Sequence, residues 1–292
     1  MPEGKIVKAL SGFYYVLTAD GEITQCRGRG VFRKNKITPL VGDSVVFQAE
    51  NDQEGYIMEV LPRKNELVRP PIANIDQAIL VFSAMEPEFS TVLLDRFLVL
   101  IESKGVSPLI CISKMDLLDE DANLIKFADY YRSIGYEVLL TSTKEPEQLK
   151  EILPYLKDKT SVIAGQSGVG KSSLLNVLRP ELELKTDNIS SHLGRGKHTT
   201  RHVELMEIND GFVADTPGFS SLEFLEMEAE DVKECFPEFV EKSHDCKFRE
   251  CTHLKEPKCA VKEAVENEEI ASYRYKHYVS FVEEIKDRKP RY

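Results

Sequence analysis

A glycine-rich segment near the middle of the chain has the residue types and the spacing needed to hold phosphate groups. Its sequence is Gly165-Gln166-Ser167-Gly168-Val169-Gly170-Lys171-Ser172-Ser173, which fits the pattern G-x-x-x-x-G-K-S. An apolar run at 160–164 predicts a strand before it, and residues 172–178 predict a helix after it, as a phosphate cradle requires. A flexible glycine turn is the alternative interpretation, and the flanking strand and helix argue against it.

This segment predicts a phosphate site and a magnesium site together. The backbone N–H groups of residues 168–172 would point at the phosphates from a helix N-terminus. The Lys171 ammonium would reach the β- and γ-phosphates of a nucleotide, and the Ser172 hydroxyl would bind Mg²⁺. We therefore expect a nucleoside triphosphate with Mg²⁺ as the ligand.

A second polar segment could identify the base of that nucleotide. Ser113-Lys114-Met115-Asp116 follows a strand predicted at 108–112, at the edge where open α/β sheets bind ligands. A carboxylate at Asp116 can accept both hydrogens from guanine N1 and N2, and adenine offers no such pair. The Lys114 stem can lie along the base. Ordinary GTPases have asparagine where this chain has Ser113, so guanine preference rests more heavily on Asp116.

A third polar segment, Thr141-Ser142-Thr143, follows the strand predicted at 136–140. It should reach the same sheet edge, because the carboxyl ends of parallel strands meet there. By itself it would be only a polar loop. Beside Asp116, Thr141 and Ser142 are expected to contact the nucleotide.

The motif Asp215-Thr216-Pro217-Gly218 ends a strand predicted at 211–214 and would sense the γ-phosphate. Asp215 would reach Mg²⁺ through a water molecule. The N–H group of Gly218 could meet the γ-phosphate. The motif is therefore expected to complete the triphosphate site.

Residues 190–201 are polar, basic and punctuated by glycine. Such a segment can order around GTP and Mg²⁺ and loosen after hydrolysis, with Thr199 or, by slight preference, Thr200 as a magnesium ligand. A disordered connector is the alternative.

Many GTPases use glutamine to orient the attacking water, where this chain has Phe219. Catalysis must then borrow another polar group, and His198 is the candidate, although a lone histidine is more often structural.

The order of these motifs is unusual. The base-side motif at 113–116 precedes the phosphate loop, which precedes the motif at 215–218, whereas the phosphate loop comes first in an ordinary GTPase. This order predicts a circularly permuted domain. From about residue 74, strands and helices alternate, which specifies a parallel sheet with helices on both faces. The strands are predicted at 77–82, 108–112, 136–140, 160–164 and 211–214, and the helices at 92–102, 124–133, 147–156 and 172–178.

The residues before this domain predict a small barrel of the OB type. Short apolar runs at 12–17, 23–26, 44–47 and 55–60 are separated by turn signals, which is typical of such barrels. Residues 27–36 contain five cations and no acid. The cations are Arg27, Arg29, Arg33, Lys34 and Lys36. The segment could be a solvated hairpin loop, but beside the usual oligonucleotide face of an OB barrel it favours RNA binding.

The C-terminal part contains a cluster of metal-ligand types between residues 246 and 259. Its members are Cys246, Cys251, His253 and Cys259. Three thiolates and one imidazole make a closed tetrahedral set with no position for a substrate, so we predict one structural zinc ion. Scattered buried cysteines are the alternative. Cys235 and His244 lie outside this spacing and are expected to be a core residue and a surface residue, respectively. Further along the chain, a helical stripe is expected to pack in the core; its members are Tyr275, Tyr278, Val279, Val282 and Ile285.

Composition excludes several classes of protein. Hydrophobic residues make up 42% of the 292 residues, enough for a sizeable core, and the length favours two or three domains. The net charge of −11 argues against a protein that simply coats nucleic acid, but not against a local basic face. We find no apolar run of membrane-spanning length and no signal-peptide pattern, so we expect a cytoplasmic protein.

Together these motifs resemble the RsgA family, also called the YloQ or YjeQ family. The resemblance rests on the barrel, the permuted motif order, the segment Gly196-Lys197-His198-Thr199-Thr200 and the cysteine-histidine cluster. It implies a bacterial GTPase that acts late in assembly of the small (30S) ribosomal subunit, binds ribosomal RNA and is stimulated by that particle. It also supports His198 as the catalytic candidate.

The predicted fold class is therefore α/β. A circularly permuted P-loop GTPase domain is expected at 68–222. An N-terminal OB-type β-barrel at 1–67 and a C-terminal, mainly helical zinc-binding domain at 223–292 are expected to flank it. Mg²⁺ bound with GTP, one Zn²⁺ and a monomeric chain are expected. Two other functions remain open at this point. They are a GTP-regulated RNA-binding protein without useful catalysis and an ATP-using P-loop enzyme.

Overall fold

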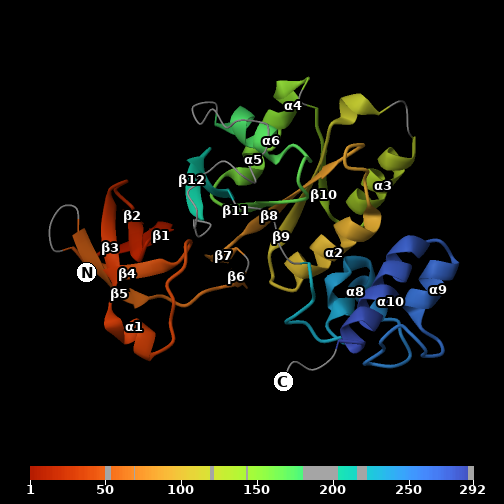
Figure 1. Cartoon of the computed structure of the whole chain (residues 1–292). Helices are drawn as coiled ribbons and strands as arrows, with labels where there is room; N and C mark the ends of the chain where they lie inside the picture. The colour runs from red at the N-terminus through yellow and green to blue at the C-terminus, as the bar shows by residue number, and fades with distance from the viewer. Residues whose placement is uncertain are drawn as a thin grey trace.

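The computed structural model describes residues 1–49, 54–68, 70–118, 122–142, 144–179, 203–215 and 222–288. Figure 1 shows three lobes: the N-terminal strands form one, a layered α/β unit forms the second, and the C-terminal helices form the third. The α/β lobe lies between the other two. Within the described ranges, no helix is both long and apolar enough to span a membrane.

The N-terminal lobe is a closed barrel. Its strands are β1 (Glu3–Leu10), β2 (Phe13–Thr18), β3 (Ile23–Gly28), β4 (Ser44–Ala49) and β5 (Glu54–Val60). They pair in the order β1-β2-β3-β5-β4, β4 pairs again with β1, and β3 runs parallel to β5. Because side chains alternate along a strand, Val16, Cys26 and Ile57 point inward and are fully buried. The predicted OB-type barrel is confirmed.

Two features of the barrel differ from the sequence prediction. The apolar runs do not reveal β1, because Lys5 and Lys8 interrupt its apolar residues. The basic segment is not a plain hairpin loop either, since β3 ends at Gly28 and the short helix α1 (Gly30–Lys34) follows. Phe32 of α1 is buried in the core, and this apolar contact holds the helix against the barrel.

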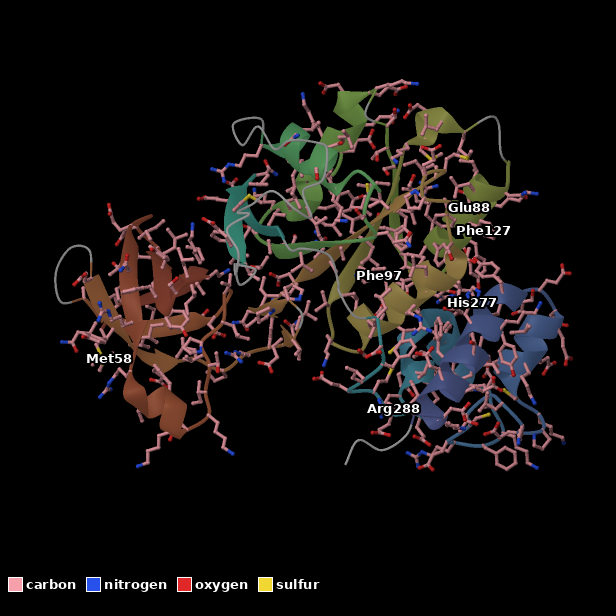
Figure 2. The ribbon with its side chains drawn as sticks, in the orientation of Figure 1. Met58, Glu88, Phe97, Phe127, His277 and Arg288 are labelled. Atoms are coloured by element: carbon pink, nitrogen blue, oxygen red, sulfur yellow. The ribbon has the colours of Figure 1, made fainter. Side chains whose placement is uncertain are left out.

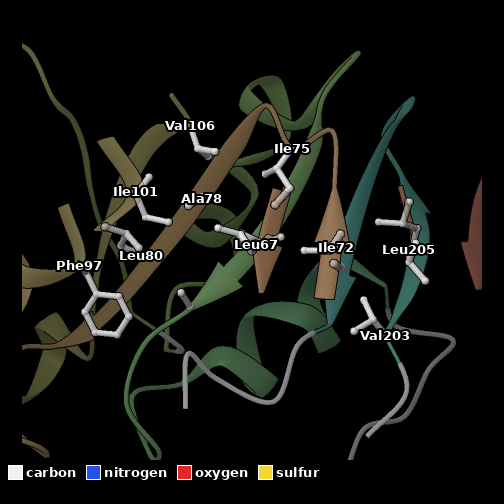
Figure 3. Close-up of a cluster of buried hydrophobic side chains, with 14 of the residues drawn as sticks. Leu67, Ile72, Ile75, Ala78, Leu80, Phe97, Ile101, Val106, Val203 and Leu205 are labelled. Atoms are coloured by element: carbon white, nitrogen blue, oxygen red, sulfur yellow. The ribbon is translucent and has the colours of Figure 1, made fainter. Parts of the chain in front are cut away.

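A short hairpin connects the barrel to the α/β lobe. It consists of β6 (Glu66–Val68) and β7 (Pro71–Ala73) and precedes β8 (Gln77–Ser83). Figure 3 shows Leu67 and Ile72 of this hairpin near Ala78 and Leu80 of β8, and all four belong to one buried cluster that also contains barrel residues. The core continues from the barrel through the hairpin into the α/β lobe, so burial alone does not define where one domain ends. The limits 1–67, 68–222 and 223–292 remain our proposal for the domains.

The α/β lobe contains the predicted parallel sheet. Its further strands are β9 (Ser107–Ser113), β10 (Glu137–Leu140), β11 (Thr160–Ala164), β12 (Glu204–Ile208) and β13 (Gly211–Asp215). The order is β10-β9-β8-β11-β13-β12, in which β12 and β13 are antiparallel and the other neighbours are parallel. The chain forms the base-side strand β9 before the phosphate-loop strand β11. The permuted order is therefore built into the sheet.

Helices cover both faces of this sheet. They are α2 (Thr91–Glu102), α3 (Ala122–Ser133), α4 (Pro146–Lys150), α5 (Leu153–Leu156) and α6 (Lys171–Leu178). Leu80 of β8 belongs to the buried cluster of α2 and α3, whereas its neighbour Val81 belongs to that of α4, α5 and α6. The single helix predicted at 147–156 is wrong: α4 ends at Lys150 and α5 begins at Leu153. Pro154, in the first turn of α5, has no N–H group to continue the hydrogen-bond ladder from α4.

The barrel is joined edge to edge with the sheet of the α/β lobe. β1 pairs with β12 with Lys8 opposite Glu204, and the two side chains form an ion pair at 2.9 Å. Lys5 Nζ donates to Thr160 Oγ1 at 3.1 Å and lies 4.7 Å from the centre of the Phe212 ring. Burial between the lobes lowers the pKa of Lys5. One sheet of eleven strands thus runs through both lobes.

The C-terminal lobe has its own apolar core. Its elements are η3 (Val232–Cys235), α8 (Pro237–Ser243), α9 (Ala260–Glu266) and α10 (Ser272–Lys286). Tyr278, Val282 and Ile285 are buried as predicted, with Tyr275 and Val279 packed beside them. The helical stripe did not include Phe281, which is also buried. Cys235 is buried and His244 is exposed, as expected.

A buried ionic cluster joins this lobe to the α/β lobe. Arg274 of α10 is fully buried, and its guanidinium donates to Asp95 of α2 at 2.6 Å and to Glu238 of α8 at 2.7 Å. Tyr131 OH donates to the same Asp95 oxygen at 2.5 Å, and His277 Nδ1 lies 2.6 Å from the other. Burial alone would lower the pKa of Arg274, but Asp95 and Glu238 outweigh it and raise the pKa well above its usual value.

Aromatic contacts surround this cluster. Figure 2 shows His277 of α10 and Phe127 of α3 where the two lobes meet, and the Phe127 ring lies 5.4 Å from that of Tyr273. Nearby, Arg96 of α2 donates to Glu284 Oε1 at 2.8 Å. The interface therefore combines apolar burial with charges that both lobes supply.

Candidate functional site

The polar ends of neighbouring strands meet at the carboxyl edge of the parallel sheet. β8 ends at Ser83 and β9 at Ser113, and the strand register sets these two residues opposite each other. β11 ends at Ala164, directly before the glycine-rich loop. This edge is where open α/β sheets bind ligands. The base-side and phosphate-side motifs therefore share one site.

The phosphate loop leaves β11 in a sharp turn that requires glycine. Gly165 has φ of 143°, and a Cβ on it would lie 2.1 Å from the Val81 carbonyl oxygen, so no larger residue fits there. Gly170 has φ of 97° and immediately precedes α6. Val169 is fully buried and anchors the loop. Gln166, Ser167 and Gly168 are exposed, which leaves this side of the loop open to a ligand.

Lys171 lies across the loop. Its Nζ donates to the carbonyl oxygens of Gly165 at 2.9 Å and Gln166 at 2.6 Å. Ser172 and Ser173 follow in the first turn of α6 and are partly exposed. The N-terminus of this helix carries a partial positive charge. Ammonium, hydroxyl and helix N-terminus together suit a phosphate group.

The base-side motif holds Asp116 as an anion. Ser142 Oγ donates to Asp116 Oδ1 at 2.6 Å, and Lys144 Nζ lies 3.0 Å from Oδ2. Both hydrogen bonds lower the pKa of Asp116, and the one from Ser142 has the larger effect. An ionised carboxylate only accepts hydrogen bonds, as recognition of guanine requires. Lys144 was not among the predicted site residues, and its position directly after the polar segment 141–143 was the available signal.

The backbone of the motif turns where these side chains begin. Lys114 has φ of 60°, and its ammonium donates to the carbonyl oxygen of Glu86. Met115 N–H donates to the carbonyl oxygen of Thr141 at 3.1 Å. This bond ties the two base-side segments together. Thr141 and Ser142 are both buried, so they hold the motif in place from the interior of the lobe.

A cavity of about 200 Å³ lies between the base-side motif and the phosphate loop. Ser113, Lys114 and Asp116 line one side, and Gly170 and Ser173 line the other. The apolar residues of its lining are Val81, Cys111, Leu117, Leu149 and Leu174. An apolar lining with a carboxylate at one side suits a nucleobase. The cavity also reaches the first turn of α6, as a nucleotide must.

Ser113 has a contact that the sequence does not reveal. Its Oγ lies 2.5 Å from the Val169 carbonyl oxygen and 3.0 Å from that of Phe82. A hydroxyl has one hydrogen, so the shorter contact is the main bond. Ser113 is 6% exposed and links the base-side strand to the anchor of the phosphate loop. The departure from asparagine therefore leaves a polar side chain that positions the loop.

Replacing Ser113 with Ala should weaken binding of GDP about 2- to 10-fold, because one buried hydrogen bond that positions the phosphate loop is lost. Titration with a fluorescent GDP analogue measures the effect. Ser133→Ala is the matched control, since that hydroxyl also donates to one carbonyl oxygen, at 2.7 Å, but outside the site. Equal affinities of the two variants would contradict the positioning role.

His198, Thr199, Thr200 and Gly218 lie outside the described residues. Asp215 is placed by its backbone alone, which ends β13 and pairs with Glu204. Its strand end lies on the same carboxyl edge as the phosphate loop, beside β11.

The four predicted metal ligands converge in the C-terminal lobe. The ligand atoms of Cys246, Cys251, His253 and Cys259 all lie within 4.8 Å of one another. Cys246 Sγ lies 4.0 Å from Cys259 Sγ, and His253 Nδ1 lies 3.3 Å from Cys259 Sγ. Around a tetrahedral zinc ion with Zn–S bonds of about 2.3 Å, sulfur atoms would lie about 3.8 Å apart. The cluster therefore has the size to hold one metal ion.

The loop between these ligands is braced by its own residues. The Glu256 carboxylate accepts from the N–H groups of Thr252 at 2.8 Å and Leu254 at 3.0 Å. Burial opposes ionisation, but these hydrogen bonds outweigh it and lower the pKa of Glu256 to about 2. Tyr275 OH donates to the His253 carbonyl oxygen at 2.7 Å. Burial also lowers the pKa of His253 to about 4, which favours the neutral imidazole that metals bind.

The basic residues predicted to bind RNA lie at the end of β3 and around α1. Arg27, Arg29, Lys34 and Lys36 are exposed. Arg33 belongs to α1. The Arg27 guanidinium lies 4.8 Å from the centre of the Phe13 ring, a contact that the sequence did not reveal.

In this sheet the base-side strand β9 precedes the phosphate-loop strand β11 in the chain, and a cavity lies between the two motifs. This arrangement defines a circularly permuted GTPase. Comparison with known proteins agrees: residues 60–225 match the family profile described as RsgA GTPase, and residues 3–57 match the RsgA N-terminal domain. The chain belongs to the RsgA family and is a GTP hydrolase.

The relatives match over the full length of the chain. The small ribosomal subunit biogenesis GTPase RsgA of Bacillus cytotoxicus is 69% identical over 294 residues, and that of Bacillus subtilis is 64% identical over 298, with 100% of both chains covered in each case. The crystal structure of YloQ, a circularly permuted GTPase, matches with a TM-score of 0.87 at 59% identity, covering 100% of this chain and 97% of that one. YjeQ from Thermotoga maritima matches with a TM-score of 0.86 at 41% identity, covering 99% of each chain.

Proposed function

We propose that this protein binds the small (30S) ribosomal subunit and its ribosomal RNA and hydrolyses GTP late in maturation of that subunit. The full-length similarity to relatives named for small-subunit biogenesis carries this proposal. The exposed cations at the end of β3 and around α1 support an RNA contact. A monomer acting in the cytoplasm fits this role.

In the proposed nucleotide complex, guanine occupies the cavity beside Asp116 and the phosphates lie over the loop at 165–172. Lys171, now hydrogen-bonded to loop carbonyl oxygens, would turn to the phosphates when they bind. Ser172, Thr200 and Asp215 are the proposed ligands of Mg²⁺, which neutralises phosphate charge when bound. The other proposed contacts are Ser113, Lys114, Met115, Thr141, Ser142, Ser173, Thr199 and Gly218.

Asp116→Ala should weaken GDP binding at least about 100-fold, because two hydrogen bonds from guanine to a carboxylate are lost. Competition of GDP and ADP against a fluorescent GDP analogue measures this change. Wild-type protein should respond to GDP and not to ADP. The exposed carboxylate of Asp129, which pairs with Arg132 outside the cavity, makes Asp129→Ala the control. Competition by ADP as strong as by GDP would indicate an ATP-using enzyme instead.

His198 is the proposed catalytic group, since Phe219 cannot orient or deprotonate water. Intrinsic hydrolysis should then be slow and should accelerate when small subunits order the segment around His198. His198→Ala should abolish the stimulated rate and leave GTP binding intact. Phosphate release with and without small subunits measures this rate, and unchanged stimulated turnover would remove His198 from the mechanism.

The decisive experiment is co-sedimentation with purified small and large ribosomal subunits, in the presence of GDP or a non-hydrolysable GTP analogue. We expect binding to small subunits alone, favoured by the GTP analogue, with faster phosphate release in parallel assays. Indifference to both subunits would overturn the proposal. Binding without multiple turnover would instead support a GTP-regulated RNA-binding protein.

A further inference from the structure

One row of side chains crosses the outer face of the barrel. The strand registers set Phe13 of β2 opposite Arg27 of β3, Arg27 opposite Tyr56 of β5, and Tyr56 opposite Gln48 of β4. The residues next to this row along β3 and β5, Cys26 and Ile57, are fully buried. Because side chains alternate between the two faces of a sheet, the row points outward.

The members of this row form a platform of planar groups. The Arg27 guanidinium lies 4.8 Å from the centre of the Phe13 ring. Tyr56 is 36% exposed. A hollow of about 110 Å³ lies between these groups, and Gln25 and Glu54 also line it. Figure 2 labels Met58, also on β5, on the side of the barrel away from the α/β lobe.

We infer that Phe13, Arg27 and Tyr56 form a stacking site for an unpaired RNA base. Aromatic rings and guanidinium planes stack on the faces of bases, whatever the base. Gln25 and Glu54 supply an amide and a carboxylate that can hydrogen-bond base edges. This inference rests on the proposed binding of ribosomal RNA and identifies which RNA the barrel takes.

Charge favours RNA over a protein partner at this face. Arg29, Lys34 and Lys36 are exposed just beyond the end of β3, while the whole chain carries a net charge of −11. Local cations on an acidic protein suit the phosphates next to a stacked base. The bases of a duplex already stack on one another, so their faces are not accessible to the platform. An unpaired segment is therefore the committed ligand.

A single reporter residue tests this inference in the full-length protein. The chain contains no tryptophan, so Tyr56→Trp places one at the platform and retains an aromatic plane. Titration with a short unpaired RNA should quench its fluorescence, because a stacked base quenches indole emission. A blunt RNA duplex of the same length should leave the emission unchanged. No quenching by the unpaired RNA, or equal quenching by the duplex, would overturn the inference.

Matched variants separate stacking from charge and from folding. Phe248 lies in the C-terminal lobe, is 42% exposed and has Lys247 over its ring, so Phe248→Trp is the control reporter and should not respond. In wild-type background, Tyr56→Leu should weaken binding of the unpaired RNA about tenfold and Tyr56→Phe should leave it unchanged. Equal affinity of the two variants would contradict stacking. If small subunits still co-sediment while the reporter is silent, this inference fails alone; if co-sedimentation also fails, the proposed function fails with it.

Discussion

Chelation of the metal proposed for the C-terminal cluster should remove one zinc ion per chain and unfold the helices of that lobe. The ligand set consists of Cys246, Cys251, His253 and Cys259. These residues lie between α8 and α9, so metal bonds would connect the loop that separates the two helices. Structural zinc sites contribute about 10–16 kcal/mol of apparent binding free energy at neutral pH. The lobe is therefore expected to depend on its metal.

Zinc content by mass spectrometry and helix content by circular dichroism measure this effect. Cys259→Ser should lose the zinc and much of the C-terminal helical signal. Cys235→Ser is the matched control, because Cys235 is buried in the same core cluster but does not belong to the ligand set. Purified protein without bound metal, or full zinc content in Cys259→Ser, would contradict the prediction.

Arg274→Met should lower the free energy of unfolding by about 3–5 kcal/mol, because removing one partner of a buried ion pair leaves uncompensated charge. Asp95 and Glu238 are both buried and both accept hydrogen bonds from this guanidinium. Methionine fills much of the volume but supplies no charge. The loss should be felt in both lobes, since Asp95 lies on α2 and Glu238 on α8.

Urea unfolding followed by circular dichroism measures the change. Lys242→Met is the control, because it removes an ion pair with Glu269 on the surface of the same lobe and should leave the midpoint unchanged. Adding Asp95→Asn and Glu238→Gln to Arg274→Met should recover part of the lost stability, since the unpaired charges are then gone. No recovery would indicate that lost packing, and not buried charge, destabilises the variant.

Local sequence patterns predicted most of the elements of the α/β lobe. The strands β8, β9, β10, β11 and β13 form at the predicted apolar runs. β12 and β1 were missed. Their pairing at Lys8 and Glu204 is a contact between residues far apart in the chain, which local periodicity does not report.

The features of the candidate site also fall into two groups: those that local sequence patterns predicted and those that only the fold reveals. The glycine pattern predicted the phosphate loop, since Gly165 admits no side chain beside Val81. The ligand spacing predicted the cluster at residues 246–259. The bonds of Ser113 to Val169 and of Lys144 to Asp116 required the fold, because their partners come from different strand ends and loops.

The sequence alone determined the class of protein, because a phosphate loop, a base-side motif and a thiolate cluster depend on residues close together in the chain. Their order alone indicated circular permutation. Tertiary structure decided how the three lobes are joined: through β1 and β12 on one side and through the buried charges of Asp95, Glu238 and Arg274 on the other. A charged residue in a helix is ordinarily expected at the surface, and only the packing of two lobes buries Arg274 between its partners.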